Sequence, residues 1–597
     1  MPMSTQTGMG ARIYDGGVGF RVWAPFAQRV AVAGEFNNWS TNANALSSEG
    51  NGYWFGDVPG ARTGQQFKYV ITNGGASYWR NDPYAREVTR SENNSVIHDP
   101  NFDWQENYGT PGWDELVIYE MHVGTFNPSS STKPGTFEGV ISKLDYLRDL
   151  GVNAIEVMAS GEFNADMSWG YNPAYMFAIE IAYGGIQAFK DFVQAAHNHS
   201  IAVIFDVVYN HLGDPALDMW RFDGWSQGSY GGIYFYNDWR AHTSWGETRL
   251  DYGRGEVRQY IRDNALAWLE SRRVDGLRWD ATGWIRNVYG NNNDPDNDIP
   301  DGWSLMQWIN DEINTRQPWK ISIAEDMQNN LWLTKTTAVG GAGFDSQWDA
   351  HFVHTIRDTI IPPNDGDRDM YSVANAIQAQ YNQSVLERVV YTESHDEDAN
   401  GHSRVPEEIW PSNAGSYFSK KRSTLGAALV FTAPGIPMIF QGQEFLEDGW
   451  FSDSRALDWA KLQTYAGITN LYRDLIRLRR NWYNNTRGLR GENVNVFHIN
   501  NADKVIAFHR WRQGGSGDDV VVVANMANRS YGSYTIGFPR SGRWKVRFNS
   551  DWSGYSGDFT NQLSYDTMAD PFAKDGMPYQ GNVGVGPYSV IVLSQDD

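Results

Sequence analysis

The sequence predicts an α/β fold, a closed (β/α)8 TIM barrel with a β-sandwich domain at each end of the chain. At 597 residues the chain exceeds the ~250–300 residues at which one hydrophobic core stops growing, so two or three domains are expected. Strands alternate with helices between about 115 and 445, which is typical of parallel sheets. No dinucleotide-binding glycine turn follows the first strand, which favours a barrel over an open sheet.

The N-terminal segment, residues 1–108, is expected to form a β-sandwich. Phe20, Val22 and Ala24 alternate with more polar positions, and Arg29–Ala33 forms a second run of this kind. Turn signals separate the runs at Gly16-Gly17, Asn37-Asn38, Asn51-Gly52 and Gly74-Gly75.

The catalytic barrel is expected over residues 109–488. Apolar runs predict strands at Leu116–Glu120, Val152–Met158, Ile201–Val208, Gly276–Asp280, Lys320–Glu325, Arg388–Thr392 and Ile436–Phe440. Apolar residues three and four apart predict helices over 137–147, 189–196, 257–270 and 305–313. A loop insertion at about 209–254 is rich in Trp, Tyr, Gly and Asp, and long loops of this kind are usually functional.

The C-terminal segment, residues 489–597, returns to β alternation. The expected strands are Val494–Ile499, Lys504–Trp511, Asp519–Val523, Trp544–Phe548 and Tyr588–Leu593. This pattern predicts a second β-sandwich.

Composition excludes several classes of function. A net charge of −22 argues against a nucleic-acid partner, which would need clustered Lys and Arg. The absence of cysteine excludes disulfides, thiolate metal sites and a cysteine nucleophile. The most apolar stretch, Leu425–Phe440, is too short and too interrupted to span a bilayer, so no membrane partner is expected. The opening MPMSTQTGMG has no signal-peptide pattern. This favours a cytoplasmic protein by default and leaves secretion open if a leader was removed.

Aromatic residues are unusually frequent, with 26 Trp, 31 Tyr and 28 Phe. Most of them are expected in the core, because aromatic burial dominates core energetics. The remainder are suited to sugars, whose flat C–H faces stack on aromatic rings while their hydroxyls take polar partners.

Ionisable residues follow four of the expected barrel strands at their C-terminal ends, where barrel enzymes place their active sites. The four segments are DVVYNH at 206–211, GLRWD at 276–280, IAED at 323–326 and ESHD at 393–396. Each residue alone is more often a loop cap, but four clusters in one barrel predict a common site.

The residue types point to sugar chemistry. Arg278 and Asp280 are two apart in a strand and should face the same way, so the arginine favours the charged form of a nucleophilic carboxylate. Glu325 ends an apolar strand, and partial burial would raise its pKa enough for it to donate a proton. Asp396 adds a third carboxylate. A retaining glycosidase needs one nucleophile and one acid around an oxocarbenium-like transition state.

These four segments resemble the signature regions of the α-amylase superfamily, glycoside hydrolase family 13. The resemblance implies Asp280 as nucleophile, Glu325 as general acid/base and Asp396 as the transition-state-stabilising carboxylate. It also implies substrate contacts from Arg278, His211, His395, Asp206 and, in the WGYNP segment, Trp169 and Tyr171. FRVWAP, FNNW and FKY near the N-terminus are similar to the family 48 carbohydrate-binding module.

The resemblance implies an α-glucan polysaccharide or malto-oligosaccharide as substrate and leaves the reaction open. DVVYNH favours an α-amylase-type endo-hydrolase cleaving α-1,4 bonds of starch or glycogen, which is the main hypothesis. YEMHVGTF, ESHDE and IFQGQEF are similar to branching enzymes, the alternative. A non-catalytic glucan-binding protein is a second alternative. No cofactor is required, although family amylases often use the residue equivalent to Asn210 as a ligand of a structural calcium.

Overall fold

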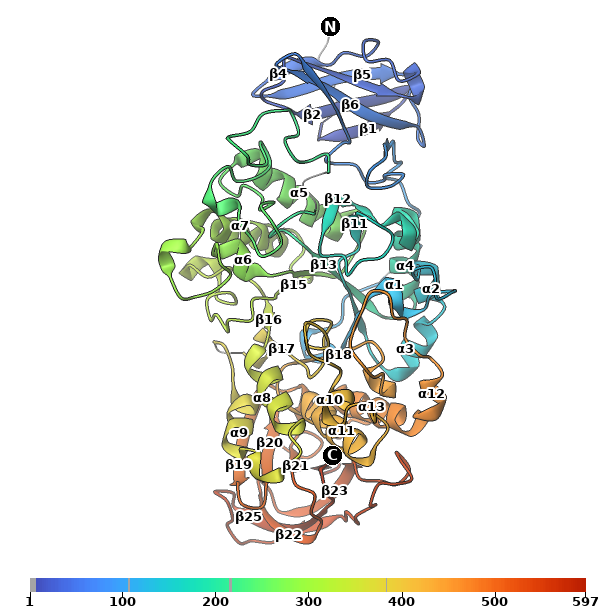
Figure 1. Ribbon diagram of the computed structural model, residues 1–597. Coiled ribbons are helices and arrows are strands. Elements are labelled where there is room, and N and C mark those ends of the chain that lie inside the picture. Colours follow the sequence, from blue (N-terminus) through green and yellow to red (C-terminus); the bar gives the residue numbers. More distant parts are fainter. Residues whose placement is uncertain (1–6, 106–107, 214–216, 383) are drawn as a thin grey trace.

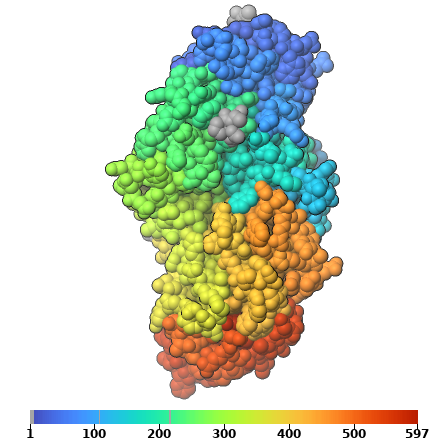
Figure 2. Space-filling model, viewed as in Figure 1, coloured from blue at the N-terminus to red at the C-terminus, as the bar shows by residue number. Residues whose placement is uncertain are grey.

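The computed structural model describes residues 7–105, 108–213, 217–382 and 384–597. Three parts follow one another along the long axis, an N-terminal β module, a central barrel and a C-terminal β domain (Figure 1). The space-filling view shows the same elongated stack (Figure 2). Parts of two sequence predictions, the opening residues 1–6 and residues 214–216 of the loop insertion, lie outside the described residues.

The N-terminal module pairs its strands in two antiparallel sheets, as the alternation predicts. One has the order β1-β2-β5-β4, and in the other β6 pairs β3, β7 and β8. The bounds are β1 Gly10–Tyr14, β2 Gly17–Trp23, β3 Arg29–Gly34, β4 Ser47–Gly50, β5 Tyr53–Pro59, β6 Gln66–Asn73, β7 Ala76–Arg80 and β8 Ser95–Val96.

Eight parallel strands close the central barrel, which confirms the predicted fold class. They are β9 Ile118–Met121, β10 Ala154–Val157, β13 Ala202–Val207, β14 Gly276–Trp279, β15 Ile321–Ala324, β16 Ser346–Trp348, β17 Arg388–Val390 and β18 Ile436–Phe440. The sequence predictions omit β16, which has only three residues and no apolar run. A hairpin of β11 Gly161–Phe163 and β12 Pro173–Ile179 follows β10.

Helices alternate with the strands and cover the outside of the barrel (Figure 1). The segment predicted as one helix over 137–147 forms two short helices. The first ends at Ile141 and the second begins at Leu144. The helices are α1 Val123–Phe126, α2 Phe137–Ile141, α3 Leu144–Leu150, α4 Gly185–Asn198, α5 Gly255–Glu270, α6 Thr282–Arg286, α7 Pro300–Arg316, α8 Ala350–Ile360, α9 Met370–Gln378, α10 Val405–Ile409, α11 Tyr417–Thr432, α12 Lys461–Thr464 and α13 Ala466–Arg479.

The apolar stretch at 425–440 is a buried helix end followed by a strand, α11 and then β18, as expected. Within the described part of the chain, no helix has both the length and the apolar character needed to cross a bilayer.

The C-terminal domain has a six-stranded sheet, β19-β20-β21-β26-β23-β24, and a two-stranded sheet of β22 and β25. The strands are β19 Asn493–Asn500, β20 Val505–Trp511, β21 Val520–Asn525, β22 Tyr531–Phe538, β23 Gly542–Asn549, β24 Thr567–Ala569, β25 Tyr579–Val585 and β26 Ser589–Ser594. The sequence predictions omit β22, β24 and β25, whose burial is interrupted by exposed residues.

Alternate residues of the barrel strands fill the interior, since successive side chains in a strand point to opposite faces. Ile118, Ala154, Ile204, Ile323 and Met438 belong to one buried apolar cluster. At the same alternation, Asp206 and Arg278 lie nearer the C-terminal ends of their strands. Along the barrel axis, the residues on this face of the strands are therefore apolar at first and polar near the C-terminal ends.

Candidate active site

Arg278 contacts three of the carboxyl groups predicted for the site. Its side chain is fully buried, and Nη1 donates to Asp206 Oδ2 at 2.7 Å and to Asp280 Oδ1 at 3.0 Å. Nη2 lies 3.6 Å from Glu325 Oε2. The strand ends of β13, β14 and β15 are therefore brought together as expected.

The guanidinium group of Arg278 packs near two aromatic rings. Its central carbon lies 4.4 Å from the ring centroid of Trp348 and 5.7 Å from that of Tyr171. Trp348 belongs to β16, the barrel strand that the sequence predictions omit. Cation–π contact and tight packing leave Arg278 little freedom to leave the carboxylates.

Asp280 and Glu325 have different local partners. Asp280 accepts from Arg278 and also from Asn210 Nδ2, at 2.8 Å to Oδ2. Glu325 accepts one short bond from the backbone N–H of Ala281, 2.6 Å to Oε2, and has only the longer contact with Arg278. Two charged or polar side-chain donors stabilise the anion of Asp280 more than that of Glu325.

Burial and these partners shift the pKa values of Asp280 and Glu325. Burial raises the pKa of both groups, and Arg278 opposes the rise. For Glu325 the charges of Asp280 and Asp396 add to burial and bring the pKa to about 8. A carboxyl group with this pKa keeps its proton at neutral pH, whereas Arg278 and Asn210 favour the ionised form of Asp280.

Asp396 lies beside His395 in the segment that follows β17. His395 Nε2 is 3.5 Å from Asp396 Oδ2, and the Asp396 side chain is 46% exposed, which makes it accessible from the barrel mouth. His395 is almost fully buried, and burial opposes its charged form. The carboxylates of Asp396 and Glu120 outweigh that effect and raise its pKa to about 9.

Tyr171 and Trp169 form an aromatic wall next to His395. The Tyr171 ring stacks on the His395 ring at 4.9 Å between centroids, and its hydroxyl donates to Asp206 Oδ2 at 2.6 Å. Trp169 meets His395 edge-on at 6.0 Å and packs against Phe451. Both residues predicted from the WGYNP segment therefore lie against His395, and Tyr171 also binds Asp206.

His211 and Asn210 follow β13 and support Asp280. The Asn210 amide oxygen accepts from His211 Nδ1 at 2.6 Å, while its amide nitrogen binds Asp280. Burial lowers the pKa of His211 to about 4, so the ring is neutral near pH 7. His211 stacks on Trp245, which comes from the loop insertion and is half exposed.

Calcium at Asn210 stays a prediction that this geometry does not support. The amide oxygen that would bind the ion already accepts a hydrogen bond from His211, and the amide nitrogen points at Asp280. In the described ranges there is no group of three or more His, Asp or Glu side chains arranged to hold a metal ion.

Three contributors to the site were not among the predicted residues. Glu120, at the end of β9, binds His395 Nδ1 at 2.5 Å and its backbone N–H at 3.2 Å. Trp348 supports Arg278, and Trp245 covers His211. Of these three residues, only Glu120 could have been found from the sequence, because it is the acidic residue at the end of the first predicted strand, in YEMH.

Family models match nearly the whole chain. A model described as the α-amylase catalytic domain matches residues 118–243 and 218–506. Carbohydrate-binding module 48, the isoamylase N-terminal domain, matches residues 8–85, and the α-amylase C-terminal all-β domain matches residues 498–596.

Several curated proteins are similar along most of their length. The 1,4-alpha-glucan branching enzyme GlgB of Corynebacterium jeikeium is 28% identical over 95% of this chain and 81% of its own length. The enzyme of the same name from Marinobacter nauticus is 28% identical over 97% of this chain and 94% of its own length.

Solved structures share the fold. A putative alpha amylase from Salmonella typhimurium superposes with a TM-score of 0.73 at 21% identity, covering 99% of this chain and 100% of that one. A pullulanase from Anoxybacillus sp. LM18-11, complexed with maltotetraose, gives 0.77 at 21% identity, covering 99% and 88%. With the strand-end carboxylates gathered around Arg278 and the catalytic-domain model matching well over half of its length, this chain belongs to the α-amylase family, glycoside hydrolase family 13.

Proposed function

We propose that this protein is a 1,4-α-glucan branching enzyme, which cuts an α-1,4-linked chain and transfers the cut piece to a 6-hydroxyl. The observation that carries this proposal is the near full-length similarity, at 28–29% identity, to proteins named as branching enzymes. The DVVYNH segment favours hydrolysis, whereas the relatives favour the alternative, branching.

The proposed first step forms a glycosyl-enzyme. Asp280 attacks the anomeric carbon of the bound glucose unit, and Glu325 gives its proton to the departing glycosidic oxygen. Arg278 favours the ionised form of Asp280, and the two carboxyl groups contact different nitrogens of one guanidinium. Retaining enzymes use a separation of about 5–5.5 Å between two such carboxyl groups.

In the proposed second step the 6-hydroxyl of an acceptor glucan attacks the same carbon. Glu325, now ionised, takes the hydroxyl proton, the new α-1,6 bond forms, and the bond to Asp280 breaks. Asp396 would stabilise the positive charge that develops on the sugar ring in both steps, because its side chain is 46% exposed and lies beside His395.

Hydrolysis remains the second candidate function, because water can replace the sugar hydroxyl in the second step. The DVVYNH segment that favoured it builds the His211–Asn210–Asp280 chain of hydrogen bonds. That chain positions the nucleophile, which both reactions share, so the segment does not distinguish between the two acceptors.

The test uses amylose as the substrate. Branching predicts a shift of the iodine-stain spectrum to shorter wavelength with little gain of reducing ends. Products should also release short linear chains when a debranching enzyme is added. A steep rise in reducing ends without α-1,6 bonds would replace this proposal by endo-hydrolysis.

Two variants test the site itself. Asp280→Asn and Glu325→Gln should each lower glucan turnover by about 10³-fold or more while the protein stays folded, since nucleophile and proton donor are both required. Asp296→Asn is the matched control, because Asp296 is an exposed acid in a surface loop. Loss of glucan turnover in the control alone, or full activity in both site variants, contradicts the assignment. Glucan binding that survives with no turnover in the wild type would favour the non-catalytic binder.

A further inference from the structure

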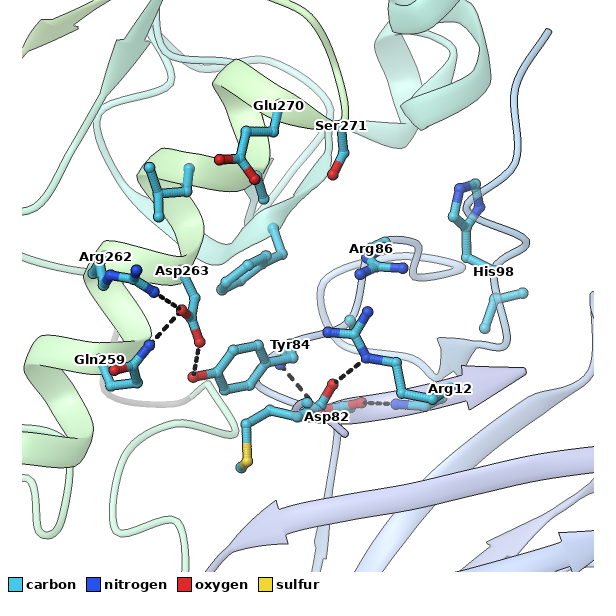
Figure 3. A pocket seen from close by; sticks show the side chains of 18 of the residues that line it. Arg12, Asp82, Tyr84, Arg86, His98, Gln259, Arg262, Asp263, Glu270 and Ser271 are labelled. Atoms are coloured by element: carbon cyan, nitrogen blue, oxygen red, sulfur yellow. Dashed lines mark hydrogen bonds and ion pairs between the residues drawn. The ribbon is translucent and has the colours of Figure 1, made fainter. Parts of the chain in front are cut away.

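A cavity of about 480 Å³ lies between the N-terminal module and α5 of the barrel, away from the catalytic carboxylates. Figure 3 shows its wall, with Arg12, Asp82, Tyr84 and Arg86 from the module and Gln259, Arg262 and Asp263 from α5. Its volume falls in the range of about 300–1,000 Å³ that small-molecule sites occupy.

The side chain of Arg86 lines this cavity. Across the part of the chain that the structure describes, it forms no hydrogen bond or ion pair, and Figure 3 draws no interaction from it. The Arg12 side chain lies beside it in Figure 3, bound through Nε to the carbonyl of Met9 at 3.0 Å. The two guanidinium groups repel each other, and the Asp82 carboxylate interacts electrostatically with both of them.

Further cations surround Arg86. Burial, followed by the charge of Arg12, lowers the pKa of Arg86 to about 10. Burial and the charge of Arg86 lower the pKa of Arg272 to about 9. Burial and the charges of Arg272 and Arg86 lower the pKa of Lys190 to about 8. In a chain with a net charge of −22, this is a local excess of positive charge.

The acidic residues of the cavity wall are already engaged. Asp263 accepts from Gln259 and from Arg262, and it accepts at 3.5 Å from the Tyr84 hydroxyl. Glu270 accepts from Arg316 at 2.7 Å. Asp82 accepts from the backbone N–H groups of Ala11 and Tyr84. Asp82 partly offsets the charge of Arg86 electrostatically, and among the described residues none of these three carboxylates hydrogen-bonds to Arg86.

We propose that this cavity binds a phosphate-bearing small molecule, with the Arg86 and Arg12 guanidinium groups as the phosphate ligands. Guanidinium groups match phosphate oxygens in pairs of parallel hydrogen bonds. Tyr84, Gln259 and Ser271 line the rest of the cavity with hydroxyl and amide groups that hydrogen-bond a sugar. A phosphorylated sugar fits both the charge and the polar wall, and free phosphate would share the same ligands.

This cavity is separate from the catalytic carboxylates. Part of its wall belongs to α5, the helix that precedes the strand with Arg278. Gln259, Arg262 and Asp263 lie on α5, and the next strand along the chain, β14, carries Arg278 and precedes Asp280. The ligand would also bridge the module and the barrel, which adds to contacts such as the bond from Tyr260 on α5 to the carbonyl of Pro83.

The experiment is calorimetric titration and thermal unfolding of the full chain with glucose 6-phosphate, inorganic phosphate and glucose at matched ionic strength. Glucose 6-phosphate should bind and raise Tm, since a ligand that binds only the folded state stabilises it. Arg86→Gln should weaken binding about 10- to 100-fold, as expected when a charged hydrogen-bond donor is lost. Arg90→Gln is the control, because Arg90 lies on the same loop, is 64% exposed and pairs with Asp166.

The relative affinities for glucose 6-phosphate and phosphate identify the ligand. Tighter binding of glucose 6-phosphate than of phosphate assigns a phosphorylated sugar, and equal affinity assigns free phosphate. No binding of either, or binding unaffected by Arg86→Gln and by Arg12→Gln, overturns the proposal. Arg12→Gln also keeps the test valid if Arg86→Gln does not fold. Unliganded Arg86→Gln should keep wild-type activity on amylose, so failure here is distinguishable from failure of the branching assignment.

Discussion

Glu120 and His395 form a buried pair across the barrel, with Glu120 Oε1 2.5 Å from His395 Nδ1 and both residues 1% exposed. They are 275 positions apart in the chain: Glu120 lies in β9, and His395 lies in the segment that follows β17. The pair fixes the histidine ring against Tyr171 and keeps it charged next to Asp396. Glu120 is therefore a positioning residue that acts through His395.

Glu120→Gln should change how stability depends on pH. The pKa of His395 is about 9 in the folded protein, above its ordinary 6.5. The stabilisation from protonated His395 is therefore fully present below pH 6.5 and is lost as pH rises through about 9. The wild-type free energy of unfolding should fall by up to about 3 kcal/mol across this window. In the variant the fall should be smaller, as measured by urea titration at several pH values. Equal slopes for the two proteins would contradict the pairing.

Glu325 should set the alkaline limit of activity. Its pKa of about 8 means that the proton donor is lost above that pH, so kcat/KM should decline with a midpoint near 8. The same shift affects stability, because a raised pKa gives stabilisation that is present below pH 4.5 and lost through about 8. Glu325→Gln should flatten the stability profile between those values. A decline of kcat/KM centred near pH 4.5 would show that the group titrates normally.

Trp245→Ala should weaken glucan binding. Trp245 is half exposed and stacks on His211, at 4.6 Å between ring centroids. Losing one aromatic contact of about 0.5–1.5 kcal/mol predicts a KM about 2- to 10-fold higher with kcat nearly unchanged. Trp319→Ala is the control, because Trp319 is also exposed and precedes β15 at the opposite end of the barrel. A loss of kcat alone would assign Trp245 to the reaction instead.

Lys421→Met should destabilise the junction between barrel and C-terminal domain. Lys421 on α11 donates to Asp551 at 2.8 Å, and both side chains are fully buried. Breaking a buried pair leaves an uncompensated charge and costs about 3–5 kcal/mol, measurable in urea. Lys545→Met removes an ion pair with Asp596 whose side chains are 40% and 51% exposed, and it should lower the free energy of unfolding far less. Similar losses in both variants would mean that burial does not decide the effect.

The sequence by itself determined the fold class and the main carboxylates of the site. Alternating strand and helix patterns place Asp206, Arg278 and Asp280 at strand ends, and the two-residue repeat of a strand makes the last two share a face. These are local regularities, so they can be found without knowing which strands are neighbours. The same regularities miss β16, whose three residues show no period.

Tertiary structure alone decided which residues support the carboxylates. The Glu120–His395 contact, the packing of Trp348 on Arg278 and the stacking of Trp245 on His211 join segments far apart in the chain. Barrel closure brings these segments together, and no local sequence pattern encodes a contact across 275 positions. The charges and burial at one strand end also depend on the neighbouring strands, which is why the high pKa of Glu325 follows from the assembled barrel.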